Sequence, residues 1–332
     1  MRPFTYVVPH TLAEAAEAAK EADTIVKAAG LDIVDRMKER LVTPQNVVNL
    51  LPLKDELAGL AQLDGGELRI GALTTLTQLE QHPALQTAAL AGLRESAAVA
   101  ATPLVRNRAT VAGNVLQFTR CWYVRSEAHR CLHGGRGPTC LALTGDNRYH
   151  SVMGYVDCMR VHPSNLAPPL LALDAEFTTT LDGKTTRRKF AELFPVAPMA
   201  QLAEHTLQPG EIVTAIHVPP QPAGTGSWYA ESREKLSFDW ATTACAARLV
   251  LAEGKIRQAT IVLGAVAPVP LRREGAEKVL VGQAPSDELF QRAASVAFAE
   301  ARPLTHNAYK LPVGKAIVRE ALLAAAAQAG RK

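Results

Sequence analysis

Apolar positions in the first part of the chain recur with the periods of short helices and strands. Thr11, followed by the Ala-, Glu- and Leu-containing run 12–19, predicts a helix with Thr11 as its N-cap and an acidic residue three positions later. The apolar run 24–28 predicts a strand, which a turn separates from a helix predicted over 33–39. Residues 1–55 are therefore expected to form a compact α/β unit.

The next segment combines a hairpin signal with helical runs. A D-G-G turn precedes a predicted strand over 68–72. Helical composition follows over 77–82 and over the Ala- and Leu-rich run 83–101. The sequence R-N-R-A-T-V-A-G-N at 106–114 then predicts a polar turn built with small residues.

Strand patterns dominate the last third of the chain. Residues 211–218 and 259–266 alternate as strands, and a helix is expected over 315–327. The alternating apolar run around Cys245 predicts a buried strand or helix in which this thiol is inert packing. We expect a domain boundary near residues 180–190, and the chain has no internal repeat or low-complexity linker.

The amino-acid composition changes between Arg120 and Arg160. This block is rich in Arg, His, Gly and Cys and has no sustained apolar period, so it cannot form a hydrophobic core of its own. A loop of this length inside a compact domain is unusual unless a bound group or a cross-link holds it together. Four of the five cysteines fall within it: Cys121, Cys131, Cys140 and Cys158.

Composition and charge exclude several classes of protein. The 332 residues suggest two or three domains, and 48% hydrophobic with 20% charged residues is ordinary for a globular protein rather than a disordered one. A net charge of +4 is too small and scattered for a nucleic-acid surface. No apolar run approaches a membrane span, and the N-terminus lacks an export signal. The compartment stays open, because a partner could carry such a signal into the periplasm.

The spacing of the four clustered cysteines leaves three interpretations. They are separated by nine, eight and seventeen residues, and four thiolates could hold an iron–sulfur cluster whose binding would supply folding energy. Two disulfides are the alternative in an oxidising compartment. Zinc is less favoured, because structural zinc sites usually show paired C-x2–4-C knuckles. The cations around them fit a negatively charged cluster or a solvated basic loop equally well: Arg120, Arg125, His129, Arg130, His133 and Arg136.

Two turns have the composition of anion-binding elements. They lie at 27–38 and at 106–114, where small residues let backbone N–H groups approach a phosphate. Neither contains G-x-G-x-x-G within a repeated βαβ array, so a Rossmann domain is not predicted. No nucleophile set and no paired carboxylates stand out, and we expect no catalytic residue in this chain.

The order of these motifs resembles the FAD-binding medium subunit of the molybdenum hydroxylases, the xanthine dehydrogenase family. The matching features run through most of the chain: R-P-F-T-Y, A-G-L-D, L-R-I-G-A-L-T-T-L, R-N-R-A-T-V-A-G-N, H-P-S-N-L-A-P, L-Q-P-G-E-I-V and L-G-A-V-A-P-V-P. The resemblance implies an α+β protein with a vanillyl-alcohol-oxidase (PCMH-type) FAD-binding fold. Its two α/β subdomains would cover 1–55 and 56–180, followed by a smaller C-terminal α+β domain of the CO dehydrogenase flavoprotein type at 185–332.

An insertion at 119–160 narrows the resemblance. It is similar to the insertion that holds a [4Fe-4S] cluster in the flavin subunit of bacterial periplasmic aldehyde oxidoreductases of the three-subunit type. Hydroxybenzoyl-CoA reductase has a comparable insertion with a different cysteine spacing, and its medium subunit is an alternative. The cluster ligands implied by this resemblance are Cys121, Cys131, Cys140 and Cys158.

The resemblance also implies where FAD would make contact. The first turn departs from the family's A-G-G-T pattern, so a glycine tolerant of positive φ and a hydroxyl are lost, at about 1–2 kcal/mol if that geometry is needed. The family's H-P-S-D is here H-P-S-N, which exchanges a carboxylate for an amide. The implied flavin contacts are Ala28, Ala29, Gly30, Leu31 and Asp32 in the first turn, Thr110, Gly113 and Asn114 in the second, and Ser164 with Asn165.

The resemblance implies an electron-transfer subunit of a heterotrimer, most similar to an aldehyde oxidoreductase. Substrate would be oxidised at a molybdopterin centre on a large subunit, and electrons would pass through [2Fe-2S] clusters of a small subunit to FAD on this chain. The external acceptor and the substrate are not indicated by the sequence. The altered first turn motivates an alternative, a structural or electron-relay subunit that keeps the cluster and has lost FAD.

Overall fold

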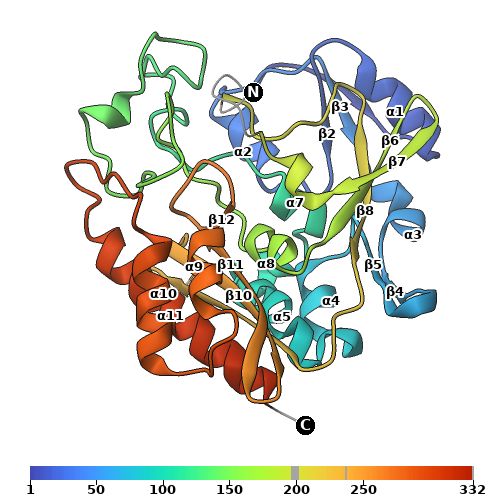
Figure 1. Ribbon diagram of the computed structural model, residues 1–332. Helices are drawn as coiled ribbons and strands as arrows, with labels where there is room; N and C mark the ends of the chain where they lie inside the picture. Colours follow the sequence, from blue (N-terminus) through green and yellow to red (C-terminus); the bar gives the residue numbers. More distant parts are fainter. Residues whose placement is uncertain (196–201, 236–237, 331–332) are drawn as a thin grey trace.

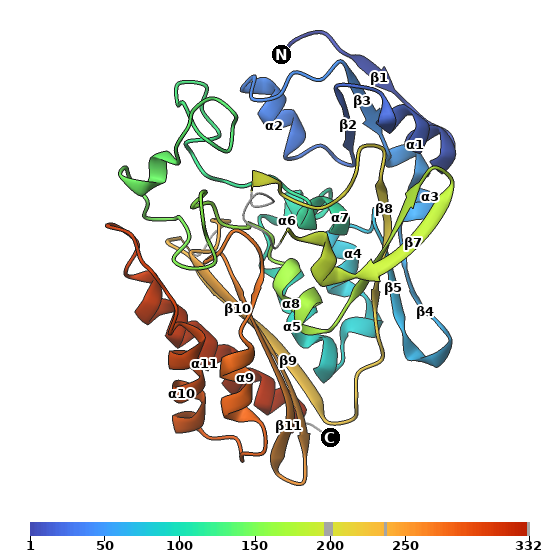
Figure 2. The same ribbon diagram turned by 45° about the horizontal axis from the view of Figure 1, so that its top comes forward.

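The computed structural model describes residues 1–195, 202–235 and 238–330. Its first unit is a parallel sheet with strand order β1-β3-β2, made of Thr5–Val7, Asn46–Asn49 and Thr24–Lys27. Helices α1 (Leu12–Lys20) and α2 (Ile33–Lys38) connect these strands. Figures 1 and 2 show this unit in blue at one end of the molecule.

Local signals account for this first unit. Thr11 has an extended backbone, and its hydroxyl accepts a hydrogen bond from the Glu14 amide at 3.1 Å, which confirms the predicted cap. The alanine face of α1 is buried against Val48 and Leu57, which makes a small core. The strand predicted at 24–28 is also present.

The second unit is a five-stranded antiparallel sheet with strand order β4-β5-β8-β6-β7. All seven residues of β8 are buried, which suits a strand in the middle of the sheet. The strands are β4 (Leu60–Gln62), β5 (Leu68–Gly71), β6 (Glu176–Leu181), β7 (Lys184–Lys189) and β8 (Ile212–Val218). The accompanying helices are α3 (Lys54–Leu57), α4 (Leu76–Gln81), α5 (Ala91–Ala98), α6 (Pro103–Arg106), α7 (Val111–Val115) and α8 (Ala167–Ala172).

The strand pairing bears on the domain boundary. Strands β7 and β8 follow residue 183 in the chain, yet they pair with β6 and β5 in the second sheet. The third sheet begins only at Thr225. We therefore propose a boundary between Val218 and Thr225 in place of the one expected near 185.

The helix predicted over 83–101 is wrong for its first half. Two 3-10 turns, Pro83–Leu85 and Ala88–Leu90, precede α5. The break turns α5 so that Gly92 meets β9 (Thr225–Ser232), where a Cβ on this glycine would lie 3.0 Å from Trp228 backbone atoms. Close packing between two distant segments thus overrides the high helix propensity of the alanines.

The third unit is a four-stranded antiparallel sheet with strand order β12-β11-β10-β9. Its strands β10 (Thr243–Ala252), β11 (Lys255–Gly264) and β12 (Leu271–Arg272) follow β9. Cys245 lies in β10 and is fully buried, as expected for packing. Three helices pack on this sheet and share its core: α9 (Glu274–Leu280), α10 (Asp287–Ala297) and α11 (Lys310–Ala329).

Between α7 and α8 the chain forms open loops with one 3-10 turn, Leu141–Leu143, among its described elements. Figures 1 and 2 show this insertion in green, beside α2 and near the start of α11. Its apolar cluster is small and is completed by Leu304, just before α11. The insertion thus depends on other parts of the chain for its position.

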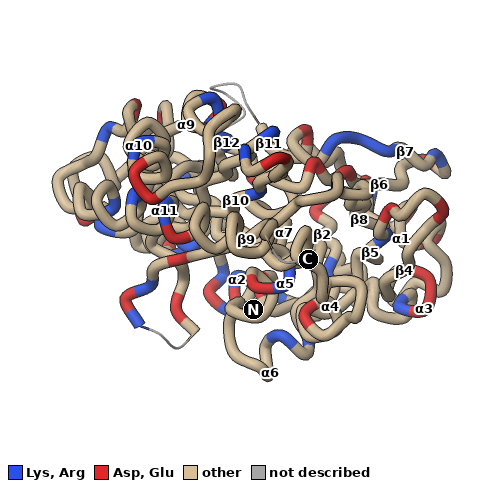
Figure 3. Tube along the Cα trace, turned by 60° about the horizontal axis from the view of Figure 1, so that its bottom comes forward, with Lys and Arg blue, Asp and Glu red and all other residues tan. Residues whose placement is uncertain are grey.

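Charge is concentrated on one edge strand. Figure 3 shows Lys and Arg along β7, and Arg187 and Arg188 pair with Glu67 and Glu211. A charged edge strand protects a sheet from pairing with another chain. No helix in the described ranges is long and apolar enough to cross a bilayer.

Candidate functional site

The first turn keeps the one glycine that its backbone requires. Gly30 has φ +84°, and a Cβ there would lie 3.1 Å from Val34 Cγ2. Ala29 does not have positive φ, so the alanine at this position causes none of the strain anticipated from the sequence. Leu31 is 49% exposed at the tip of the turn. The altered turn is therefore compatible with the backbone geometry that this loop adopts.

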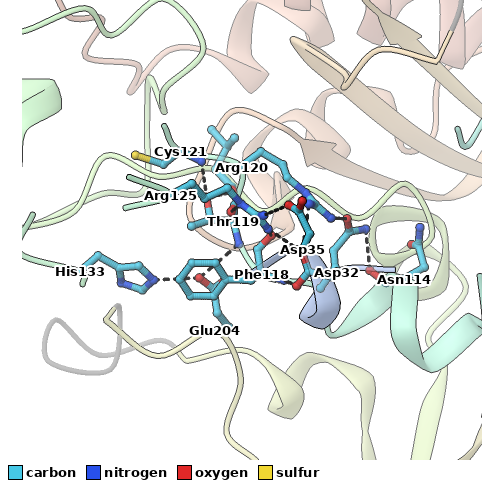
Figure 4. Close-up of polar contacts among 12 residues, drawn as sticks. Asp32, Asp35, Asn114, Phe118, Thr119, Arg120, Cys121, Arg125, His133 and Glu204 are labelled. Atoms are coloured by element: carbon cyan, nitrogen blue, oxygen red, sulfur yellow. Dashed lines mark hydrogen bonds and ion pairs between the residues drawn. The ribbon is translucent and has the colours of Figure 1, made fainter. Parts of the chain in front are cut away.

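Asp32 joins the first turn to the insertion. Its carboxylate accepts hydrogen bonds from the Phe118 amide at 3.0 Å and from Arg125 Nη2 at 2.5 Å, and it pairs with Arg120 Nη1 at 2.9 Å. Figure 4 shows these side chains converging on Asp32. Because the carboxylate is already engaged, Asp32 positions the insertion, a role that the sequence did not indicate.

The second turn and the Ser164 segment come together. Thr110 caps α7 by accepting a hydrogen bond from the Gly113 amide at 3.2 Å, and a Cβ on Gly113 would lie 2.8 Å from Thr110 Oγ1. Asn114 Oδ1 accepts a hydrogen bond from Ser164 Oγ at 2.6 Å. Four sequence-predicted contacts therefore share one network, and a side chain at Gly113 would clash with the cap.

Asn165 is bound by a carboxylate that the sequence did not reveal. Its Nδ2 donates to Glu231 Oε2 at 2.7 Å, and the Tyr229 hydroxyl donates to the same oxygen at 2.6 Å. Burial raises the pKa of Tyr229 well above its usual value. The carboxylate missing at position 165 is thus present nearby, on β9.

A pocket opens where these elements meet. The empty space between them is about 800 Å³ when the open mouth is included. His162 lies in its wall, nine-tenths buried or more, and both ring nitrogens lack a hydrogen-bond partner among the described residues. Burial lowers the pKa of His162 to about 3, so the ring is neutral. The lining joins the insertion to the Ser164 segment and the C-terminal sheet through Cys121, Trp122, Ser164, Asn165, Tyr229 and Trp240.

The four insertion cysteines are free thiols, and three of them are buried. Cys140 and Cys158 are hydrogen-bonded to each other, and the thiol of Cys158 lowers the pKa of Cys140 to about 6. Cys121 interacts electrostatically with Cys131 and Cys140, while burial raises its pKa to about 12. Within the described ranges, no three His, Cys, Asp or Glu side chains surround a single-ion site. Among these residues the geometry therefore shows neither a zinc site nor the expected cluster, and the four cysteines stay a prediction as ligands.

The cations of the insertion are used mostly for holding the loop. Arg136 donates to the carbonyls of Val124 at 2.8 Å and of Ser126 at 3.1 Å. His133 Nε2 lies 2.9 Å from Glu204 Oε1 in a buried contact that Figure 4 also shows. Buried cations and imidazoles with such partners replace the core that the insertion lacks.

Comparison with known families agrees with this architecture. Residues 2–221 match the family described as the FAD binding domain in molybdopterin dehydrogenase, and residues 227–325 match the CO dehydrogenase flavoprotein C-terminal domain. The fold class expected from the sequence is confirmed. The expected FAD-binding domain is likewise confirmed.

Individual relatives cover the whole chain. The aldehyde oxidoreductase FAD-binding subunit PaoB of Escherichia coli is 34% identical over 99% of this chain and 100% of its own. The carbon monoxide dehydrogenase medium chain of Hydrogenophaga pseudoflava is 30% identical over 97% of this chain and 96% of its own. A solved carbon monoxide dehydrogenase structure from the same organism aligns over 99% of both chains, with a TM-score of 0.76 and 27% identity.

The full-length similarities and the two matched domains agree with the glycine-bearing turns and with the three-sheet architecture. The chain belongs to the family of FAD-binding subunits of molybdenum hydroxylases.

Proposed function

We propose that this chain is the electron-transfer subunit of a heterotrimeric aldehyde oxidoreductase and that it carries both FAD and a [4Fe-4S] cluster. The aldehyde assignment is supported by 34% identity to an aldehyde oxidoreductase subunit over the full length of both chains. The partners would be a large molybdopterin-binding subunit and a small [2Fe-2S] subunit, with an external electron acceptor. The redox chemistry belongs to the cofactors, and this chain binds, orients and tunes them.

For FAD, the supporting observation is that a hydrogen bond connects the second turn to the wall of the pocket. A Cβ on Gly113 would clash with the Thr110 hydroxyl that caps α7, and the Asn114–Ser164 hydrogen bond joins this turn to a residue of the pocket wall. The unpaired His162 nitrogens in the same wall suit a polar ligand or water carried with it. We propose that Gly30 and Thr110 with its turn hold the phosphate side, and that the pocket holds the ring system.

For the cluster, the supporting observation is that four free thiols lie within one segment that has no core of its own, two of them in contact with each other. Cys140 contacts Cys158, and Cys131 and Cys140 are both near enough to Cys121 to add to the rise in its pKa that burial causes. A four-iron cluster binds each thiolate at a different iron, so its ligands lie farther apart than those of one ion. The binding energy would organise the insertion, as metal binding does in other coreless segments.

The cofactor content of the anaerobically purified complex tests both parts. We expect one flavin and four iron atoms per complex beyond those of the [2Fe-2S] clusters. Cys131→Ala should lose the additional iron while FAD and partner clusters remain. The matched control is Cys245→Ala, which removes a fully buried thiol outside the insertion and should keep all the iron.

Each part has its own contradicting result. Unligated or disulfide-bridged insertion thiols in the anaerobic wild-type complex, with no additional iron, would refute the cluster. Additional iron without flavin would instead indicate the relay subunit that has lost FAD. Reduction of a hydroxybenzoyl-CoA-type substrate, with loss of its hydroxyl group as water, in place of aldehyde oxidation would move the assignment to that related enzyme.

A further inference from the structure

Lys310 is a fully buried lysine at the start of α11. Its ammonium donates to the carbonyl oxygens of Tyr149 and Ala265, both at 3.0 Å. Tyr149 belongs to the insertion, whereas Ala265 directly follows β11. One side chain therefore ties the insertion to the C-terminal sheet.

The charge of this side chain has no counter-ion among the described residues, where no carboxylate oxygen lies within 4.0 Å of the ammonium. Burying a cation without a carboxylate costs several kcal/mol. Two carbonyl oxygens recover only part of this cost, since each contributes one charge-assisted hydrogen bond. Burial accordingly lowers the pKa of Lys310 to about 7.

A neutral side chain three residues away performs the same mechanical task. Asn307 is also fully buried, and its Nδ2 donates to the carbonyls of His150 and Ser151 at 3.2 and 3.1 Å. An amide is thus sufficient to fix backbone carbonyls of this segment. The distinguishing property of Lys310 is its charge.

That charge lies directly behind the pocket. Both carbonyl acceptors, Tyr149 and Ala265, belong to residues that line it. Ala265 is held at φ +57°, a conformation that costs a non-glycine residue about 1–2 kcal/mol. Ala265 is part of the pocket wall, and in this strained conformation its carbonyl oxygen accepts a hydrogen bond from the Lys310 ammonium.

We propose that Lys310 is a positioning residue whose buried positive charge, one residue layer behind the pocket, stabilises the reduced flavin relative to the oxidised flavin. This proposal rests on the proposed function, which puts the flavin ring in the pocket. Reduction of a flavin by two electrons with uptake of one proton leaves one negative charge on the ring. The electrons come from the partner subunits, and a cation behind the wall attracts the added charge.

The test is the flavin midpoint potential in purified complexes carrying Lys310→Gln or Lys310→Arg. Gln keeps a hydrogen-bond donor without the charge, whereas Arg keeps the charge. Lys315→Gln is the matched control, since it removes a partly exposed lysine from the same helix. The titrations are run at least about one pH unit below the lowered pKa of Lys310, where the ammonium is charged.

We expect Lys310→Gln to weaken binding of reduced relative to oxidised flavin at least tenfold. For a two-electron couple this corresponds to a midpoint potential about 30 mV lower. Lys310→Arg should restore most of the difference, and Lys315→Gln should match the wild type. If the Gln variant does not assemble, Lys310→Met keeps the side-chain length without charge and should show the same shift.

Three results would overturn the proposal. One is an unchanged flavin potential in the neutral variants, and another is an Arg variant as low as the Gln variant. The third is a change in the midpoint potential of an iron–sulfur cluster while the flavin midpoint potential stays the same. Absence of flavin from the wild-type complex is a different result, because it refutes the proposed function before any potential is measured.

Discussion

Replacing Asn165 by Asp would restore the residue that the family pattern carries and should destabilise this protein. In the structure, Asn165 Nδ2 donates to Glu231 Oε2 at 2.7 Å. An aspartate in the same place would bring two carboxylates to hydrogen-bond distance inside a buried site. The amide at position 165 is therefore matched to the carboxylate on β9.

The magnitude follows from the distance and the burial. Two unit charges 4 Å apart interact by about 4 kcal/mol at an effective dielectric constant of 20. The hydrogen bond lost from Asn165 to a charged acceptor adds roughly 1.5–3 kcal/mol. Arg233, which also contacts Glu231, offsets part of the repulsion, and one carboxyl can take up a proton. We expect a net loss of about 2–4 kcal/mol at neutral pH.

Urea unfolding at several pH values measures this loss. The carboxyl pair in the folded variant keeps a shared proton at pH values where the unfolded carboxyls have lost theirs. The folded state then binds more protons, so the stability of Asn165→Asp relative to wild type should fall as pH rises from about 5 to about 8. Adding Glu231→Gln should remove the pH dependence. Equal stability of Asn165→Asp and wild type across this range would refute the reasoning.

Three further predictions concern the turns and the pocket wall. Gly113→Ala places a Cβ 2.8 Å from Thr110 Oγ1, so we expect a loss of about 1 kcal/mol from the cap and weaker flavin retention, read from thermal unfolding and released flavin; retention equal to wild type would contradict a role of this turn in holding flavin. Asp32→Asn removes the charge that pairs with Arg125 and should cost about 3 kcal/mol, with faster limited proteolysis inside the insertion; an unchanged cleavage rate would argue against the docking role. Because the pKa of His162 is lowered from 6.5 to about 3, the unfolded state binds the extra proton, and stability is lost as pH falls through this interval. His162→Phe should flatten that acid loss by up to about 1.4 kcal/mol per pH unit, measured by unfolding at each pH, and a parallel curve would exclude this histidine as its source.

Sequence patterns predict the elements whose causes are local. The Thr11 cap, the strand at 24–28 and the turn at Gly30 each depend on neighbouring residues, and all are present. The strand expected at 259–266 overlaps β11, which ends at Gly264. Such elements can be derived from a single sequence because their signals lie within a few residues.

The remaining features depend on contacts between distant segments. The alanine-rich helical pattern is broken before α5, whose Gly92 packs against Trp228, far away in the chain. Glu231 reaches Asn165 across 66 positions, and no local signal marks it. The ion pair of Asp32 could not be predicted for the same reason, since its partner Arg125 comes from the insertion 93 residues later.

The contacts of Lys310 and Asn307 with the insertion also bear on biosynthesis. The insertion is translated about 150 residues before Asn307 and Lys310, so it leaves the ribosome before the side chains that anchor it have been made. Domains usually fold in the order in which they are synthesised. We therefore expect the cysteine-bearing loops to stay accessible to the iron–sulfur delivery machinery until translation ends, and to close only when the last helix forms.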